Sequence, residues 1–266
     1  NNFEGDRIIF KSPLRLPRSG REKKSRKEII NMKNQDFNIL RKEGESKRGL
    51  FANVIGATGL VGKQLVAMLL ENENFEKVRI FVRRDAGLKH PKLEQHIVDF
   101  GKSEIWENKL TGDVLFSALG TTLKQAGSKE KQYEIDFTFN LNFAQRAKEN
   151  SIENYVLVSS VGANAKSGIF YSRMKGELDE AVLKIGFKNL AILRPASLTG
   201  NRSERRVAEV ISIPVLNVLT RFMLKNYRPI SDKIVAQAMI NAALNNPGSK
   251  IIWEAGEVFE LGADLL

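Results

Sequence analysis

The segment VIGATGLVG, residues 54–62, places three glycines at intervals of three: Gly56, Gly59 and Gly62. The first ends a run of apolar or small residues, and the third lies where a helical pattern begins. In such a strand–turn–helix, glycines permit a tight turn, and the helix N-terminus offers free N–H donors and partial positive charge to a pyrophosphate. The alternative is a turn in which the glycines serve only to pack the helix on the strand. A mononucleotide P-loop is disfavoured, because Gln64 follows Gly62 and Lys63.

Short apolar runs alternate with helical patterns over most of the chain. Strand-like runs occupy residues 50–56, 77–84, 96–100, 113–120, 155–160, 189–195 and 250–261, and helical patterns occupy 63–72, 133–150, 171–186 and 231–246. This alternation is typical of a parallel sheet covered on both faces. We therefore expect one α/β domain over residues 49–266: a single Rossmann-type doubly wound parallel sheet with a small C-terminal substrate cap.

The net charge of +11 is concentrated at the beginning of the sequence. Residues 1–50 hold fourteen Lys or Arg and seven Asp or Glu, so they account for +7 of the total. With two prolines and no sustained apolar period, residues 1–48 are expected to form a basic tail that is disordered or a non-native extension. Because the body of the chain carries little excess charge, we expect no nucleic-acid binding by the folded domain.

Composition also limits the compartment and the chemistry. The chain has no cysteine, which excludes disulfides, thiolate metal sites and a cysteine nucleophile. Its two histidines, His90 and His96, are read as surface residues, and no metal site is expected. The apolar stretch 210–220 is too short to cross a bilayer, and the N-terminal segment has too many acidic residues for a targeting peptide. A cytoplasmic location is therefore expected.

The end of the second expected strand bears on which cofactor is bound. Enzymes that prefer NAD place an acidic residue there to hold the ribose 2′-hydroxyl. Here Arg83 and Arg84 end the strand, and Asp85 follows them. Two guanidinium groups could pair with a 2′-phosphate through charge-assisted hydrogen bonds, which predicts NADP (NADPH) rather than NAD. The alternative is a solvated arginine pair on a loop.

A serine, a tyrosine and a lysine follow the fifth expected strand. Tyr171 and Lys175 are four residues apart and would share one face of a helix, where the ammonium would favour the phenolate form of the tyrosine. Ser160 ends the strand at the sheet edge where doubly wound folds bind ligands. Ser159 and Ser160 point to opposite faces of a strand, so only one could reach a ligand. We expect Ser160 to hydrogen-bond a carbonyl and Tyr171 to donate the proton.

Together these motifs resemble the atypical, extended-like branch of the short-chain dehydrogenase/reductase superfamily. The greatest similarity is to the HIV-Tat-interacting-protein-like oxidoreductases, which are related to sugar-nucleotide epimerases and NmrA-like regulators. The resemblance covers residues 50–262 and rests on GATGLVG, FVRRD, VDF at 98–100, ALGTT at 118–122, SSVGANAKSGIFYSRMKGE and LRPASLTG at 193–200.

The resemblance implies further cofactor contacts. Asp99 would lie beside the adenine, Leu119, Gly120 and Thr121 near the ribose and phosphates, and Arg194 and Pro195 beside the nicotinamide. The residues then expected to bind cofactor are Gly56, Thr58, Gly59, Leu60, Val61, Gly62, Arg83, Arg84, Asp99, Phe100, Leu119, Gly120, Thr121, Tyr171, Lys175, Arg194 and Pro195. Asp136 stands where many relatives carry an active-site asparagine, which places the usual proton relay in doubt.

Three functions are compatible with these residues. The leading interpretation is an NADP(H)-binding oxidoreductase that transfers hydride to or from a small carbonyl or hydroxyl substrate, with Tyr171 as the general acid or base. The alternatives are a non-catalytic NADPH sensor that binds a regulatory protein partner, and a sugar-nucleotide epimerase or dehydratase. A homodimer is possible in each case, and the substrate is not identified by the sequence.

Overall fold

The computed structural model describes residues 48–199, 229–245 and 250–263, and all of them belong to one unit, Ile39–Leu266. Seven parallel strands form a sheet in the order β3-β2-β1-β4-β5-β6-β9. Their bounds are β1 (Leu50–Ile55), β2 (Phe75–Val82), β3 (Leu93–Ile97), β4 (Val114–Ser117), β5 (Asn154–Val158), β6 (Asn189–Arg194) and β9 (Ile252–Glu254). This confirms the Rossmann-type α/β fold that the alternating pattern predicts.

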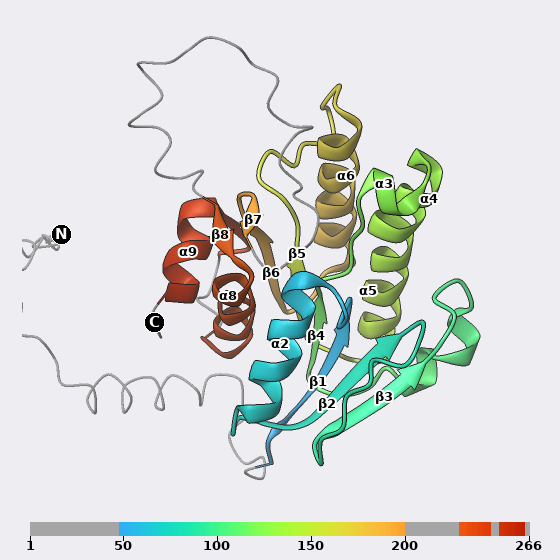
Figure 1. Ribbon diagram of the computed structural model, residues 1–266, viewed down its shortest axis with the longest axis vertical. Helices are drawn as coiled ribbons and strands as arrows, with labels where there is room; N and C mark the ends of the chain where they lie inside the picture. The colour runs from blue at the N-terminus through green and yellow to red at the C-terminus, as the bar shows by residue number, and fades with distance from the viewer. Residues whose placement is uncertain (1–47, 200–228, 246–249, 264–266) are drawn as a thin grey trace, which may run out of the picture. The chain divides into compact units, whose positions relative to one another are not determined.

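Helices cover both faces of the sheet (Figure 1). On one face α2 (Leu60–Glu71) packs against α8 (Asp232–Asn245), which also contacts α9 (Ala255–Ala263). On the other, α5 (Phe139–Glu149) packs against α6 (Phe170–Ile185). The shorter elements are η2 (Ser103–Ile105), η3 (Glu107–Lys109), α3 (Leu123–Ala126), α4 (Lys129–Tyr133), η4 (Glu134–Thr138), β7 (Leu198–Thr199) and β8 (Ile230–Ser231), the last two pairing in parallel.

The order of the strands creates a switch point between β1 and β4. From β1 the chain proceeds to β2 and β3 in one direction, whereas β4, β5 and β6 follow in the other. The connections that leave the carboxyl ends of β1 and β4 therefore diverge, and ligands of open α/β sheets bind in the crevice at this point. The glycine turn follows β1, and residues 118–121 follow β4.

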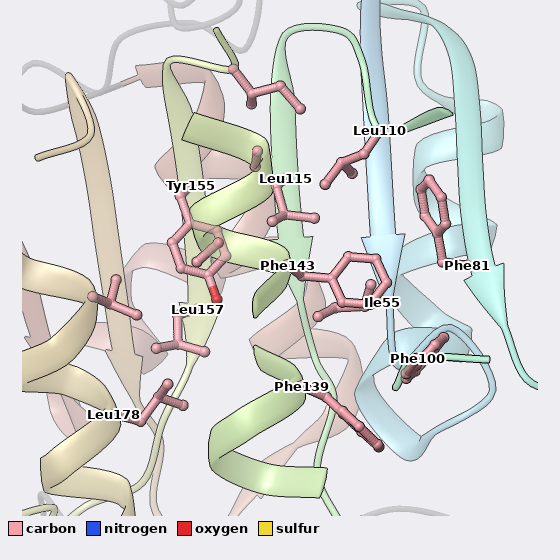
Figure 2. Close-up of a cluster of buried hydrophobic side chains, with 14 of the residues drawn as sticks. Ile55, Phe81, Phe100, Leu110, Leu115, Phe139, Phe143, Tyr155, Leu157 and Leu178 are labelled. Carbon is pink, nitrogen blue, oxygen red and sulfur yellow. The ribbon is translucent and has the colours of Figure 1, made fainter. Parts of the chain in front are cut away.

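One cluster of buried hydrophobic side chains lies between the sheet and the layer formed by α5 and α6 (Figure 2). Phe143 of α5 stacks on Trp106 with ring centroids 3.8 Å apart, and Phe81 and Phe100 meet Phe143 edge to face. Tyr155 is fully buried with its hydroxyl pointing into the same cluster, and this burial raises its pKa. The core thereby fixes the strands and helices whose ends carry the expected site residues.

Two helix and strand predictions differ from the structure. The helix expected over 133–150 starts earlier, at Lys129, and is interrupted by a π-helical turn, η4, that contains Asp136. The strand expected over 250–261 is wrong beyond Glu254, where α9 begins. Ala255, Val258 and Gly262 are the buried positions of α9, and their spacing of three and four is helical. Residues 200–228, a large part of the C-terminal segment expected to contain the small substrate cap, lie outside the described residues.

Arg194, at the end of β6, joins α6 to β9. Its Nε and Nη2 each lie 2.9 Å from Oδ2 of Asp179, and its Nη1 lies 2.9 Å from Oε1 of Glu254. Asp179 is 1% exposed, and burial raises the pKa of its carboxyl group, an effect that Arg194 opposes. The guanidinium therefore compensates a buried negative charge and fixes the final strand to the helix.

Replacing Arg194 should destabilise the fold in a pH-dependent way. In Arg194→Met, Asp179 is left buried without its main cation, which typically costs about 3–5 kcal/mol when the group is charged. Its folded-state pKa then rises further above the unfolded value, so the folded state holds a proton that the unfolded state has lost. The loss in free energy of unfolding, measured with urea, should be smaller at pH 5 than at pH 8.

The matched control is Glu254→Gln, which removes the half-exposed partner of the same arginine. It should change the free energy of unfolding by no more than about 1 kcal/mol at either pH. Equal losses at the two pH values for Arg194→Met would contradict the role given to Asp179.

Candidate functional site

The glycine turn after β1 is closed by backbone contacts that exclude side chains. Gly56 has a φ of +79°, and a Cβ atom there would lie 2.4 Å from the carbonyl carbon of Ala118. A Cβ on Gly62 would lie 2.0 Å from the Gly56 carbonyl oxygen. Gly59 is less constrained, since its Cβ would meet the same oxygen at 3.2 Å. Two of the three glycines are thus required by packing, and the turn touches the loop after β4.

The N-terminus of α2 lies in this turn. Gly59 is its N-cap residue, no side chain caps it, and its first turn contains no acidic residue. The N–H groups of Leu60, Val61 and Gly62 therefore start the helix without a capping side chain, beside the exposed residue Thr58. An unneutralised helix N-terminus of this kind favours an anion such as a phosphate group.

Arg83 and Arg84 follow β2 and are both exposed. Arg83 lines an open hollow of about 360 Å³ together with Ile97, Val98, Asp99 and Ile105. Ile97 and Ile105 are 58% and 43% exposed, so the hollow presents bare apolar surface beside a guanidinium and a carboxylate. The family resemblance implies that the adenine lies near Asp99, and the hollow is compatible with a flat aromatic ring next to a charged group.

Among the described arginines, Arg83 and Arg84 alone have no carboxylate partner. The others are paired as Arg48–Asp113, Arg79–Glu94, Arg146–Glu107 and Glu149, Arg173–Glu177, and Arg194–Asp179 and Glu254. Asp85, the next residue, bonds to other groups: its Oδ1 accepts hydrogen bonds from Gln95 Nε2 at 2.8 Å and from the Gly87 N–H at 2.9 Å. These bonds lower the pKa of Asp85.

Asp99 and Phe100 take different positions. Asp99 is exposed; its Oδ1 accepts from the Gly101 N–H at 2.9 Å, and its carbonyl accepts from Trp106 Nε1 at 3.2 Å. Phe100 is 3% exposed and packs on Phe139 and Phe143. The side chain of Phe100 therefore belongs to the core, and only its backbone could reach a cofactor.

Residues 119–121, after β4, are hydrogen-bonded to one residue of the π-helical turn η4 and to one residue of α5. The Thr121 N–H donates to Asp136 Oδ2 at 2.7 Å, and Asn140 Nδ2 donates to the Leu119 carbonyl at 3.3 Å. A Cβ on Gly120 would lie 2.9 Å from Asp136 Oδ1, so a larger residue there would press on the carboxylate. The loop that touches Gly56 is therefore fixed to the helix that follows it.

Tyr171 and Lys175 lie one turn apart at the beginning of α6, as the spacing predicts. Tyr171 is half-buried, whereas Lys175 is 2% exposed with Nζ 3.7 Å from Asp136 Oδ1. The preceding loop lies against the same helix: the Asn164 N–H donates to the Ser172 carbonyl at 2.9 Å. A Cβ on Gly176 would lie 2.1 Å from the Ala165 nitrogen, so this close contact needs glycine.

The two serines after β5 differ in accessibility. Ser159 is 5% exposed, and its hydroxyl lies close enough to Asp179 to lower the pKa of that carboxyl group, though not in hydrogen-bond geometry. Ser160 is half-buried, and its hydroxyl donates to the neighbouring Val161 carbonyl at 3.3 Å. Ser160 is thus the more accessible of the two, while Ser159 lies near Asp179 on the buried side of α6.

The structure brings the expected residues into two groups. Gly56, Leu119, Gly120, Thr121 and Lys175 are connected through Ala118 and Asp136. Arg83 and Asp99 line the hollow, and Arg84 is the next residue along the chain after Arg83. Pro195 is buried beside this end of the sheet, and its carbonyl accepts from the Val161 N–H at 3.1 Å. Arg194 has its charge already paired, so a contact with the nicotinamide stays a prediction.

Several residues that shape the site were not predicted. Asn140, Gly176 and Asp179 position the loops and charges described above, and Ile105 lines the hollow. A signal existed for two of them, because Asn140 lies four residues after Asp136 and Asp179 lies four after Lys175, on shared helix faces.

Neither metal binding nor membrane crossing is indicated in the described ranges. No group of three His, Cys, Asp or Glu side chains there could hold a metal ion. Of the histidines, His96 packs on Phe81, and burial lowers its pKa. None of the helices in the same ranges is long and apolar enough to span a bilayer.

Curated relatives correct one prediction. The chain is 34% identical to protein fmp52, mitochondrial, of Emericella nidulans, over 76% of this chain and 94% of that protein. It is 35% identical to protein FMP52, mitochondrial, of Saccharomyces cerevisiae, over 73% of this chain and 88% of that protein. Because these relatives are named as mitochondrial proteins, the prediction of a cytoplasmic location, which was inferred from composition, is wrong. A lack of cysteine fits any reducing compartment, and an acidic content does not identify the cytosol.

Solved structures share the fold at low sequence identity. ADP-L-glycero-D-manno-heptose-6-epimerase of Helicobacter pylori matches with a TM-score of 0.58 and 18% identity, over 83% of this chain and 82% of that one. UDP-N-acetylglucosamine 4-epimerase of Methanobrevibacter ruminantium matches with a TM-score of 0.56 and 16% identity, over 77% and 75%. These likenesses establish the fold alone.

The glycine turn, the switch point and the loop after β4 all lie within a segment that matches one family. The model of the NAD(P)H-binding family aligns with residues 56–246, most of the chain. Because this family model matches most of the chain, the chain belongs to the NAD(P)H-binding family.

Proposed function

We propose that the protein is an NADP(H)-dependent oxidoreductase that interconverts a small carbonyl compound and the corresponding alcohol. The observation that supports this most strongly is an unbroken set of contacts between the glycine turn and the Tyr171–Lys175 helix. Gly56 touches the backbone of Ala118, Thr121 is bonded to Asp136, and Asp136 pairs with Lys175. The phosphate-binding turn and the proton donor are therefore built on one rigid unit.

In this proposal each side chain has a separate role. Tyr171 gives a proton to the carbonyl oxygen during reduction and takes it back during oxidation. Ser160 hydrogen-bonds the same oxygen, and Lys175 holds a fixed positive charge one helical turn from the phenol. A nicotinamide nucleotide, when bound, supplies or accepts the hydride. The resemblance to the HIV-Tat-interacting-protein-like oxidoreductases supports these roles.

The preference for NADP(H) over NAD(H) is supported by unpaired charge. Arg83 and Arg84 are exposed without a carboxylate partner, and the next acidic residue, Asp85, is bonded to Gln95 and Gly87. A ribose 2′-hydroxyl would therefore find, directly after β2, a carboxylate with one oxygen already bonded, whereas a 2′-phosphate would find two guanidinium groups.

We also propose that the protein works in mitochondria, as the names of its relatives state for them. Fractionation of the cells that make it, followed by detection of the untagged protein, should recover it with mitochondrial markers. Recovery with cytosolic markers alone would contradict this part of the proposal.

The cofactor assignment is tested by binding. The unmodified protein should bind NADPH more tightly than NADH, and Arg83→Gln combined with Arg84→Gln should weaken NADPH about ten- to hundred-fold without changing NADH, because charge-assisted bonds to the 2′-phosphate are lost. Calorimetry or quenching of protein fluorescence would measure both constants. Arg146→Gln, which removes one positive charge from a paired arginine on α5, serves as the control for each arginine replaced singly. Equal affinities for the two cofactors in the unmodified protein would refute the assignment.

The catalytic assignment is tested by turnover. Tyr171→Phe should lower the rate of NADPH-dependent reduction over a panel of aldehydes and ketones by about 10²–10⁴-fold, since the proton donor is removed. NADPH binding should be nearly unchanged. Tyr133→Phe is the control, because Tyr133 is hydrogen-bonded to Glu177 at 3.0 Å. Full turnover in Tyr171→Phe would remove the proposed acid, and NADPH binding without turnover in the unmodified protein would favour a sensor.

A further inference from the structure

A π-helical turn directs one carboxylate toward the interior of the site. The turn η4 spans Glu134–Thr138 between α4 and α5, and a widened turn leaves backbone carbonyls without their usual helical donors. Asn140 Nδ2 donates to the carbonyls of Ile135 and Asp136 at 3.1 and 3.0 Å. The irregularity is thus stabilised by a dedicated buried amide, and its effect is that Asp136 is 1% exposed.

The two oxygens of Asp136 contact two different elements. Oδ2 accepts the Thr121 N–H at 2.7 Å, and Oδ1 lies 3.7 Å from Lys175 Nζ. The side chains of Asp136 and Lys175 are 2% and 3% exposed, so neither charge is compensated by solvent. A buried ammonium in such a position needs a partner, and removal of one partner leaves the other uncompensated.

The charged groups that face Lys175 come from several elements. Asp136 of η4 pairs with Lys175, and Asp179 lies one turn after Lys175 on α6. Asp179 in turn pairs with Arg194 of β6, which also pairs with Glu254 of β9. Lys175 makes a small contribution to lowering the pKa of Asp179, after Ser159 and Arg194, whereas its ion pair is with Asp136. The remaining charged groups of α4, η4 and the start of α6 have partners of their own. Lys131 pairs with Glu134, and Arg173 pairs with Glu177, which also accepts a hydrogen bond from the Tyr133 hydroxyl. The Lys129 ammonium lies over the Phe170 ring.

We propose that Asp136 is a positioning residue that holds the Lys175 ammonium against the loop at Thr121 and sets how much of its positive charge acts on Tyr171. The role rests on the proposed function only in that Tyr171 is the group to be tuned. Asp136 itself touches neither substrate nor cofactor in this arrangement, and acts through Lys175.

The direction of the effect follows from the signs of the charges. A nearby ammonium favours the phenolate form of tyrosine, and a carboxylate beside that ammonium cancels part of its field. Asp136→Asn removes the negative charge but keeps an oxygen that can accept from Thr121. Tyr171 should then experience a larger net positive charge, so it should form phenolate at a lower pH.

The test is a titration of the protein without cofactor or substrate. Phenolate absorbance is followed with pH for the unmodified protein and for Asp136→Asn, each with its Tyr171→Phe counterpart subtracted, so that the signal of one tyrosine out of four remains. The midpoint of Tyr171 ionisation should move down by on the order of one pH unit in Asp136→Asn. Because no turnover is needed, the result is independent of whether the protein is an enzyme.

The matched control is Glu134→Gln, which removes a carboxylate from the same turn that is paired outward with Lys131. Its midpoint should stay within a few tenths of a pH unit of the unmodified value, since an exposed, paired charge is largely screened. An unchanged or raised midpoint in Asp136→Asn, or an equal downward shift in Glu134→Gln, would overturn the proposal.

If Asp136→Asn does not fold, the unmodified protein still decides the question. The carbon-13 chemical shift of the Asp136 carboxyl group should respond as Tyr171 ionises, and the response should be absent in Tyr171→Phe. A carboxyl signal that does not sense this ionisation would overturn the proposal. With a carbonyl substrate in hand, the pH profile of alcohol oxidation should shift in the same direction as the titration.

Discussion

The contact between Gly56 and the backbone after β4 is the constraint on which the site depends. A side chain at Gly56 would come within 2.4 Å of Ala118, and a side chain at Gly62 within 2.0 Å of Gly56. These contacts place the start of α2 and the loop 118–121 side by side at the switch point of the sheet. Any larger residue would separate β1 from β4 at the point where a dinucleotide must lie across both.

Buried charge determines the other half of the site. Asp136, Lys175, Asp179 and Arg194 alternate in sign: Asp136 pairs with Lys175, Arg194 pairs with Asp179, and Lys175 and Asp179 are one turn apart on α6. Each ion is removed from water, so each needs the opposite charge beside it. A substitution at one position therefore changes the electrostatic environment of the next, and Arg194 connects β9 to α6 by pairing with both Glu254 and Asp179.

The parts that sequence could predict are those with a local cause. The strands, the glycine turn and the one-turn spacing of Tyr171 and Lys175 each follow from periodicity or from residue type over a few positions. The π-helical turn was not predicted, because it depends on Asn140 bonding carbonyls that only the folded helix presents. The last strand was predicted to be too long. In the described structure only the three residues of β9 pair with β6, and the apolar residues that follow form α9, which packs on α8.

The two ends of the candidate site differ in how their charges are balanced. After β2, Arg83, which lines the hollow, and Arg84 beside it in the sequence are exposed and have no carboxylate partner within the described ranges, so water screens their charges at little cost until an anion binds. At the reacting end, Lys175 is buried and already paired with Asp136, so its field is fixed before any substrate binds. Under the proposed function, affinity and chemistry should therefore be separable: changes at residues 83 and 84 would act on cofactor binding, and changes at residue 136 would act on proton transfer by Tyr171.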